Sequence, residues 1–207
     1  MQQTLLTGFG PFGNVVSNPT ERLIQRFATE TVPGHRLTFC ALPVSFARAD
    51  ALLQSALTAG GENGRPFENV LMLGVAAGSS RWRVERLGRN RDDPRLPDAD
   101  GFSSPHRAIL PDGPKTLAST FPVETILAAL HAGGIPAVLS EDAGSYLCNH
   151  VLFTTLEWLR RTGSTARAGF LHVPADEQTF ADGQILSPYF PFEQHIEAIR
   201  LTLAALA

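Results

Sequence analysis

The sequence contains little cysteine: only Cys40 and Cys148 occur among its 207 residues. Two thiols are too few for a structural zinc site, and a disulfide between them is not expected in a reducing compartment. Cys40 lies in an apolar run and has the pattern of a small buried hydrophobe, the usual role of a lone thiol. The surroundings of Cys148 are of a different kind and indicate chemistry.

An excess of positive charge and long apolar runs are also absent. Lys and Arg number 17 against 20 for Asp and Glu, which argues against a nucleic-acid-binding surface. No run approaches the length that spans a bilayer, and the N-terminus lacks the basic start and cleavage site of a signal peptide. Charged residues make up only 18% and hydrophobic residues 43%, so disorder is not expected. We therefore expect a globular, cytoplasmic protein that binds neither membrane nor nucleic acid.

Short apolar runs alternate with helical patterns along the chain. Five runs are expected to form buried parallel strands: residues 4–7, 37–42, 70–73, 137–139 and 168–173. Five helices are expected at residues 19–28, 47–59, 123–132, 146–161 and 192–205. Such alternation predicts one layered α/β domain, residues 1–207, with helices on both faces of the sheet. Residues 88–113 are charged, rich in Pro and Asp and without period, so we expect a functional loop or an excursion that covers a site.

The glycines at 8, 10 and 13 spell the dinucleotide-binding fingerprint, but a nucleotide site is not expected there. The helix start is signalled later, by Asn18 as N-cap, and Pro11 removes a backbone N–H that a phosphate would need. Phe9 and Phe12 either pack in the core or line a small apolar pocket, and the sequence leaves both roles open.

Cys148 follows a Gly-containing turn and is expected in the first turn of a helix. An apolar strand ends near Ser140, and Ser145 is the expected N-cap. The unpaired N–H groups and the helix dipole at such a position stabilise a thiolate and can hold an oxyanion. A simple packing role for this thiol stays open as the alternative.

A thiolate nucleophile needs a base within hydrogen-bond reach, and six histidines compete for that role. His172 ends an apolar strand, where open α/β sheets place their ligands. His150 is two positions from Cys148, and that spacing points to a different face of a helix. His195 is expected on the solvated face of the terminal helix. His172 is therefore the expected base.

A third group would be a carboxylate that fixes the tautomer of the imidazole. Glu85, Asp176 and Glu177 are equally suited by their chemistry. The residues alone do not choose among them.

Four segments in order carry a family resemblance that runs over nearly the whole length of the chain: residues 6–13 with 18–19, residues 74–78 with 84–86, 90, 93 and 95–98, residues 134–137 with 143–150, and residues 169–174 with 177–178. They resemble the signatures of the pyroglutamyl peptidase I (pyrrolidone-carboxylate peptidase) family of cysteine peptidases. The resemblance implies a Cys–His–Glu triad, with Cys148 as nucleophile, His172 as general base and Glu85 as orienting carboxylate. It further implies that five residues bind the substrate: Phe9, Phe12, Arg95, Tyr146 and Leu147.

The implied fold is a three-layer α/β/α sandwich around a mixed, mostly parallel twisted sheet, commonly assembled into homo-oligomers without metal or organic cofactor. The implied activity is hydrolysis of the amide bond after an N-terminal pyroglutamyl residue of small peptides, through a thiol acyl-enzyme. Two alternatives stay open: another thiol-dependent amidohydrolase acting on a different small acyl group, and a catalytically idle pyroglutamyl-binding protein. Departures from the family pattern concern substrate affinity and optimum pH rather than the triad, and they lie at Val75, Ser79, Glu141 and Asp142.

Overall fold

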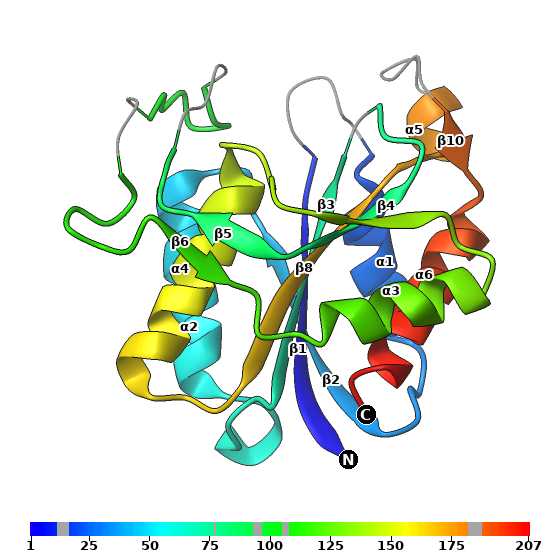
Figure 1. Ribbon diagram of the computed structural model, residues 1–207, viewed down its shortest axis with the longest axis horizontal. Coiled ribbons are helices and arrows are strands. Elements are labelled where there is room, and N and C mark those ends of the chain that lie inside the picture. The colour runs from blue at the N-terminus through cyan, green and yellow to red at the C-terminus, as the bar shows by residue number, and fades with distance from the viewer. Residues whose placement is uncertain (12–16, 77, 93–96, 105–107, 182–187) are drawn as a thin grey trace.

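A six-stranded sheet with strand order β2-β1-β3-β8-β4-β7 forms the centre of the molecule (Figure 1). The computed structural model describes residues 1–11, 17–76, 78–92, 97–104, 108–181 and 188–207. In sheet order the strands are β2 (His35–Leu42), β1 (Gln2–Phe9), β3 (Asn69–Val75), β8 (Arg167–Val173), β4 (Trp82–Glu85) and β7 (Ala137–Ser140).

The sheet is mixed and mostly parallel, as predicted. β1 pairs in parallel with β2 and β3, and β3 pairs in parallel with β8. β4 runs antiparallel to β8 and parallel to β7. The sequence pattern predicted five of these strands and missed β4, because its four residues alternate apolar and charged side chains and form no continuous apolar run.

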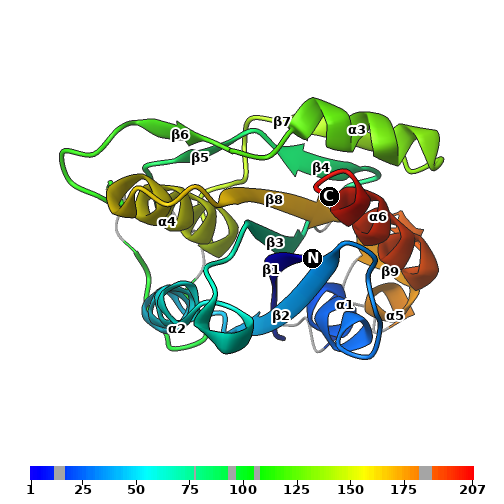
Figure 2. The ribbon, with the colours of Figure 1, turned by 90° about the horizontal axis from the view of Figure 1, so that it is seen from below.

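Helices cover both faces of the sheet and give the predicted three layers (Figure 2). One face packs against α2 (Phe46–Ala59) and α4 (Leu147–Thr162). The other face packs against α1 (Pro19–Phe27), α3 (Val123–Ala132) and α6 (Phe192–Ala204). The bounds of these five helices agree with the predicted ranges to within one residue. The helical period was a strong signal because each helix buries one apolar stripe.

Two separate hydrophobic cores lie on the two sides of the sheet, and β8 shows how its side chains alternate between them. Phe170 joins the core under α2 and α4, whereas Leu171 and Val173 join the core under α1, α3 and α6. Successive side chains of a strand point to opposite faces. His172 therefore projects on the same side as Phe170, toward α2 and α4.

Smaller elements complete the described chain. β5 (Leu87–Arg89) pairs antiparallel with β6 (Thr116–Ala118), and β9 (Ala175–Asp176) pairs parallel with β10 (Tyr189–Phe190). A 3₁₀ turn spans Glu62–Gly64, and the short α5 spans Glu177–Ala181.

The predicted excursion at residues 88–113 is anchored to the two helices on one face of the sheet. Asn149 of α4 accepts from Arg89 N–H at 2.8 Å and donates to the carbonyl of Arg89 at 2.9 Å. Asp98 accepts from the backbone N–H of Phe46, the first residue of α2, at 3.0 Å. These bonds hold the described part of the segment against the starts of α2 and α4.

The N-terminal caps of α1 and α4 differ in how well the sequence predicted them. Asn18 caps α1 as predicted: its Oδ1 accepts from Thr20 N–H at 3.0 Å. The prediction for Ser145 is wrong, because α4 begins at Leu147 with Tyr146 as N-cap and without a side-chain cap. The start of α4 therefore lies one residue later than the turn chemistry indicated.

Candidate active site

Cys148 is the second residue of α4, and its sulfur approaches the sheet next to β8. Within the described chain no side chain caps this helix, so the N–H groups of its first turn can face a thiolate or an oxyanion. Gly74 of β3 lies opposite His172 in the register, and a Cβ there would come within 2.8 Å of the Cys148 sulfur. Glycine at position 74 is thus what allows the sulfur to reach this part of the sheet.

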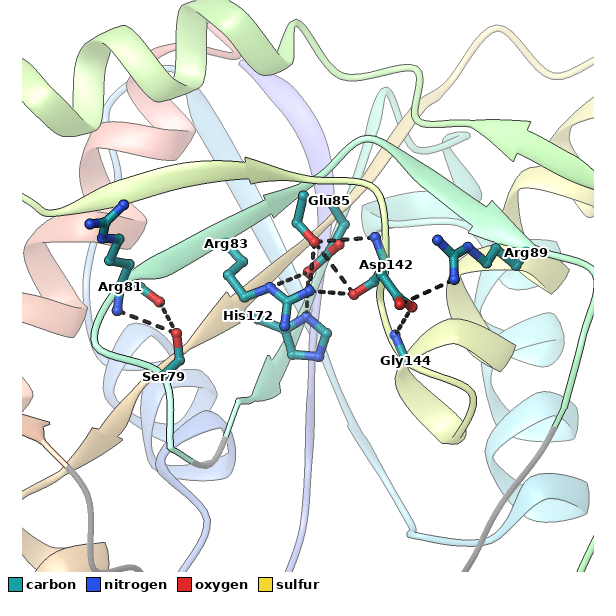
Figure 3. Close-up of polar contacts among 9 residues, drawn as sticks. Ser79, Arg81, Arg83, Glu85, Arg89, Asp142, Gly144 and His172 are labelled. Carbon is teal, nitrogen blue, oxygen red and sulfur yellow. Dashed lines mark hydrogen bonds and ion pairs between the residues drawn. The ribbon is translucent and has the colours of Figure 1, made fainter.

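His172 and Glu85 meet across two antiparallel strands (Figure 3). The register pairs Arg83 with His172 and Glu85 with Phe170, so His172 and Glu85 are diagonal neighbours on one face of the sheet. Nδ1 of His172 donates to Oε1 of Glu85 at 2.8 Å. His172 is 5% exposed and Glu85 is completely buried. This bond orients the ring and leaves its Nε2 for the Cys148 sulfur.

The environment of His172 favours the protonated imidazole. Burial by itself lowers the pKa of His172, because it disfavours a charged ring. The negative charge of Cys148 and the hydrogen bonds to Cys148 and Glu85 outweigh burial and raise the pKa of His172 to about 9. The arrangement is therefore a histidine ring held between the Cys148 sulfur and the Glu85 carboxyl group, and it favours the protonated form of that ring.

A cavity of about 230 Å³ lies directly beside Cys148. It is lined by Phe9, Asn18, Val44, Val75, Ala143, Tyr146, Leu147 and Cys148. Most of these side chains are apolar, and the volume suits a small ring rather than a long side chain. An acyl group seated here would present its carbonyl to the thiolate at the start of α4.

Phe9 and Tyr146 have double roles in the wall of this cavity. Phe9 is 4% exposed and belongs to the core under α2 and α4, so it packs and lines the cavity at once. The Tyr146 hydroxyl donates to the carbonyl of Pro97 at 3.2 Å. Burial, together with the charges of Asp98 and Cys148, raises the pKa of Tyr146 to about 12, so its phenol is neutral.

The structure brings six of the eight predicted site residues together: Glu85, Phe9, Tyr146, Leu147, Cys148 and His172. Phe12 and Arg95 lie outside the described residues. The sequence did not indicate that Asn18, Val44 and Ala143 line the cavity, and it marked Val75 only as a departure from the family pattern. Val44 follows the end of β2 and Val75 ends β3, so the rule that parallel strands place ligands at their carboxyl ends was the signal available.

The two other candidate acids bind elsewhere. Asp176 pairs with Arg22 and accepts from Thr179 N–H at 2.9 Å. Glu177 accepts from the backbone N–H of Phe192 at 2.7 Å. Glu85 is thus the acid of these three that contacts His172.

Two other histidines, His150 and His195, also had positions predicted from the sequence. Nδ1 of His150 is 2.9 Å from Asp92 Oδ2, whereas the histidine hydrogen-bonded to Cys148 is His172. The prediction for His195 is wrong, because this residue is fully buried with its ring 5.1 Å from Trp82. It follows the helical spacing of the buried Ile199 and Thr202, so it lies on the apolar stripe of α6 rather than on its solvated face.

The described residues contain no group of three His, Cys, Asp or Glu side chains placed to hold a metal ion. No helix in the described ranges combines the length and apolarity needed to cross a membrane.

Cys40 is a free, buried thiol whose pKa is raised by burial, which agrees with its predicted packing role.

Comparisons with known proteins identify the family to which the chain is similar. Residues 2–207 match the family model described as pyroglutamyl peptidase. The chain is 37% identical to the pyrrolidone-carboxylate peptidase of Thermococcus litoralis, over 98% of this chain and 92% of that protein. It is 35% identical to the corresponding protein of Streptomyces coelicolor, over 100% and 93%.

Solved structures show the same likeness. The pyrrolidone carboxyl peptidase of T. litoralis superposes with a TM-score of 0.89 over 99% of this chain and 93% of that chain. A variant of the enzyme from Pyrococcus furiosus, 32% identical, superposes with a TM-score of 0.90 over 99% and 97%.

Proposed function

This chain belongs to the pyroglutamyl peptidase family, and we propose that Cys148, His172 and Glu85 are the catalytic triad with which it works. It is a cysteine peptidase that removes an N-terminal pyroglutamyl residue from peptides. The matches lend no support to the two alternative functions considered from the sequence.

One observation carries the assignment of the triad: the 2.8 Å bond from His172 Nδ1 to the buried Glu85 carboxylate, with the Cys148 sulfur hydrogen-bonded to the same ring. A nucleophile, a base and an acid that orients the base are the three parts of nucleophilic acyl transfer. The raised pKa of His172 supports a thiolate–imidazolium pair that exists before substrate arrives.

Acylation begins when the Cys148 sulfur attacks the carbonyl carbon that joins pyroglutamate to the next residue. The oxyanion that forms is stabilised by the N–H groups at the start of α4. His172 then gives its proton to the leaving nitrogen, the C–N bond breaks, and the shortened peptide departs with a free amine. Pyroglutamate remains as a thioester on Cys148.

Deacylation uses the same groups in reverse. The neutral imidazole of His172 takes a proton from water, and the resulting hydroxide adds to the thioester carbonyl. The C–S bond breaks, free pyroglutamate leaves, and the thiolate–imidazolium pair is restored. Glu85 accepts a hydrogen bond from the ring throughout and keeps it in one orientation.

The cavity beside Cys148 is proposed as the site for the pyroglutamyl ring. A pyroglutamyl residue is a neutral five-membered lactam without a free ammonium, and it suits a small, mostly apolar slot. Phe9, Tyr146 and Leu147 line that slot, and Phe12 and Arg95 are proposed to complete it. Four broader expectations also stand as proposals: one peptidase domain over residues 1–207, assembly as a homo-oligomer, a cytoplasmic location, and catalysis without metal or organic cofactor.

The proposal is tested by measuring release from a pyroglutamyl-linked fluorogenic amide. Proline and unblocked glutamine amides serve as controls, because they differ from pyroglutamate in the lactam carbonyl and in the closed ring. We expect cleavage of the pyroglutamyl amide alone. Comparable cleavage of the proline amide would contradict recognition of the lactam, and cleavage of the glutamine amide would point to an ordinary aminopeptidase.

A further inference from the structure

Arg83 places a permanent positive charge beside the proposed triad. It lies on β4, two residues before Glu85 and opposite His172 in the antiparallel register. Residues two apart on a strand share a face, so its side chain projects on the same side as Glu85 and His172 (Figure 3). The side chain is 32% exposed and mostly covered by the protein.

The guanidinium joins three elements of the site. Its Nε is 3.4 Å from Glu85 Oε1, the oxygen that also accepts from His172. Its Nη2 donates to Ser140 Oγ at 2.6 Å and to the backbone carbonyl of Asp142. Ser140 ends β7 beside Glu85, and Asp142 lies in the turn that leads into α4. Arg83 therefore connects the acid of the triad with the segment that carries the nucleophile.

Asp142 is also held from its other side. Its Oδ1 accepts from Gly144 N–H at 3.0 Å, and its Oδ2 is 3.1 Å from Arg89 Nη1 (Figure 3). The turn before Cys148 is thus tied to β5 through Arg89 and to β4 through Arg83. Only Arg83 also meets the triad acid.

Glu85 requires a cation throughout the reaction cycle. A fully buried carboxylate is strongly disfavoured unless its charge is compensated, and within the described residues Glu85 Oε2 has no hydrogen-bond partner. His172 supplies a positive charge only until it protonates the leaving nitrogen. At that point Arg83 is the cation that stays beside Glu85.

We propose that Arg83 is a positioning residue for the reaction: it compensates the charge of Glu85 and holds this carboxylate in place while His172 is neutral, and it fixes the turn that places Cys148. The proposal rests on the proposed triad. Among the described residues, Arg83 on its own strand and His172 on β8 pair with Glu85. Cys148 on α4 acts on His172, and the Asp142–Arg89 pair lies beyond Arg83.

The test compares Arg83→Met, which keeps the length of the side chain but removes its charge, with Arg83→Lys, which keeps the charge. We expect Arg83→Met to lower kcat by about tenfold or more while KM stays within about twofold, since Arg83 touches the triad acid and not the cavity. Arg83→Lys should recover most of the lost kcat. In Arg83→Met the acid limb of the pH profile should move to higher pH, because the site loses a permanent positive charge that favours its ionised groups.

Arg81→Met is a matched control, because Arg81 directly precedes β4 and lies two residues before Arg83. Arg81 meets Ser79 only through its backbone N–H and carbonyl, and its side chain is exposed. This variant should keep the kcat, KM and pH profile of the unmodified protein. Thermal melts of all three variants show whether any loss of activity is a loss of folded protein.

Alkylation of Cys148 by iodoacetamide, measured against pH, reports the thiolate without any peptide substrate. Arg83→Met should shift this profile in the same direction as the kinetic one. An unchanged kcat in Arg83→Met would overturn the proposal, as would a fall in kcat with an unshifted alkylation profile and no recovery in Arg83→Lys, which would mark a purely structural residue. If the unmodified protein fails to cleave a pyroglutamyl amide, the proposed function fails, and the alkylation profiles still decide the role of Arg83.

Discussion

His172 and His195 are both buried imidazoles, yet their surroundings drive their pKa values in opposite directions. Burial acts on each ring to lower the pKa. His172 also meets Cys148 and Glu85, which raise its pKa to about 9. His195 meets Trp82 and lies near the charge of Arg22, and burial lowers its pKa to about 3 despite the nearby carbonyl of Ala175.

Burial is the largest cause of the lowered pKa of His195, whereas at His172 the contacts with Cys148 and Glu85 outweigh the same effect of burial. Placing a carboxylate and a thiol around an imidazole costs desolvation of all three groups. That desolvation cost is present at the proposed active site around His172. At His195 it is avoided, because the ring is neutral and packs among the apolar residues of α6. A perturbed pKa therefore marks chemistry only when specific partners cause it.

The largest effect is expected from removing the thiolate partner of His172. Cys148→Ala and Cys148→Ser should each lower peptidase activity by more than about 100-fold, because no other group in the triad can form the thioester. Without the thiolate the pKa of His172 should fall, which NMR titration of the imidazole can follow. Both variants should remain folded and show a cooperative thermal unfolding transition.

Cys40→Ala is the matched control for Cys148, because its thiol is buried on β2 and far along the sheet from β8. It should leave activity largely intact. Full activity in Cys148→Ala would end the assignment of the nucleophile.

Neutralising the carboxylate partner should have the next largest effect. Glu85→Gln should lower kcat by roughly 10²–10⁴-fold with little change in KM, because an amide supports the wrong tautomer of the ring and stabilises the imidazolium poorly. It should also lower the pKa of His172 and so make this ring more like His195. Steady-state kinetics and the same NMR titration measure both effects. If kcat in Glu85→Gln matched that of the unmodified protein, another acid would have to orient the ring.

Truncating Phe9 should weaken substrate binding and leave the pKa values of His172 and His195 unchanged. We expect Phe9→Ala to raise KM by the equivalent of roughly 1–3 kcal/mol, with kcat nearly unchanged, because the ring lines the cavity in the ground state and in the transition state alike. Since Phe9 is also a core residue, the variant should lose about 3–5 kcal/mol of stability. Kinetics and melts separate the two roles. A large loss of stability with an unchanged KM would leave Phe9 as packing alone.

The smallest effect on activity is expected at His195, where the consequence concerns stability against pH. The pKa of His195 in the folded protein, about 3, lies below the ordinary value of 6.5, so the unfolded chain binds the proton first as the pH falls. The stability associated with a neutral His195 is complete above pH 6.5 and is lost toward pH 3, by up to about 1.4 kcal/mol per pH unit.

His195→Leu removes this dependence while keeping an apolar side chain of similar size on α6. As the pH falls from 7 to 4, the melting temperature of the unmodified protein should therefore fall relative to that of His195→Leu. Activity at neutral pH should not change. Parallel melting curves across this range would show that His195 does not resist protonation.

Some residues of the proposed site were predictable from the sequence, and others were not. The helix that carries Cys148 was predictable because its apolar period is strong, and His172 because it ends an apolar strand. Glu85 was different: the residues alone left it equal to Asp176 and Glu177, and only the family resemblance favoured it. Its strand, β4, is too short and too polar to be recognised from its pattern.

The sequence by itself determined the class of fold, the five major helices, the asparagine cap of α1 and the place of Cys148 at the start of a helix. These features depend on neighbours within a few residues, so the local pattern of apolar and capping residues is enough to predict them. Only the tertiary structure decided that β4 runs antiparallel to β8, which sets Glu85 diagonal to His172 and Arg83 beside both. It also decided that His195 is buried. Strand order, strand direction and the partner of a buried charge join residues far apart in the chain, and no local period records them.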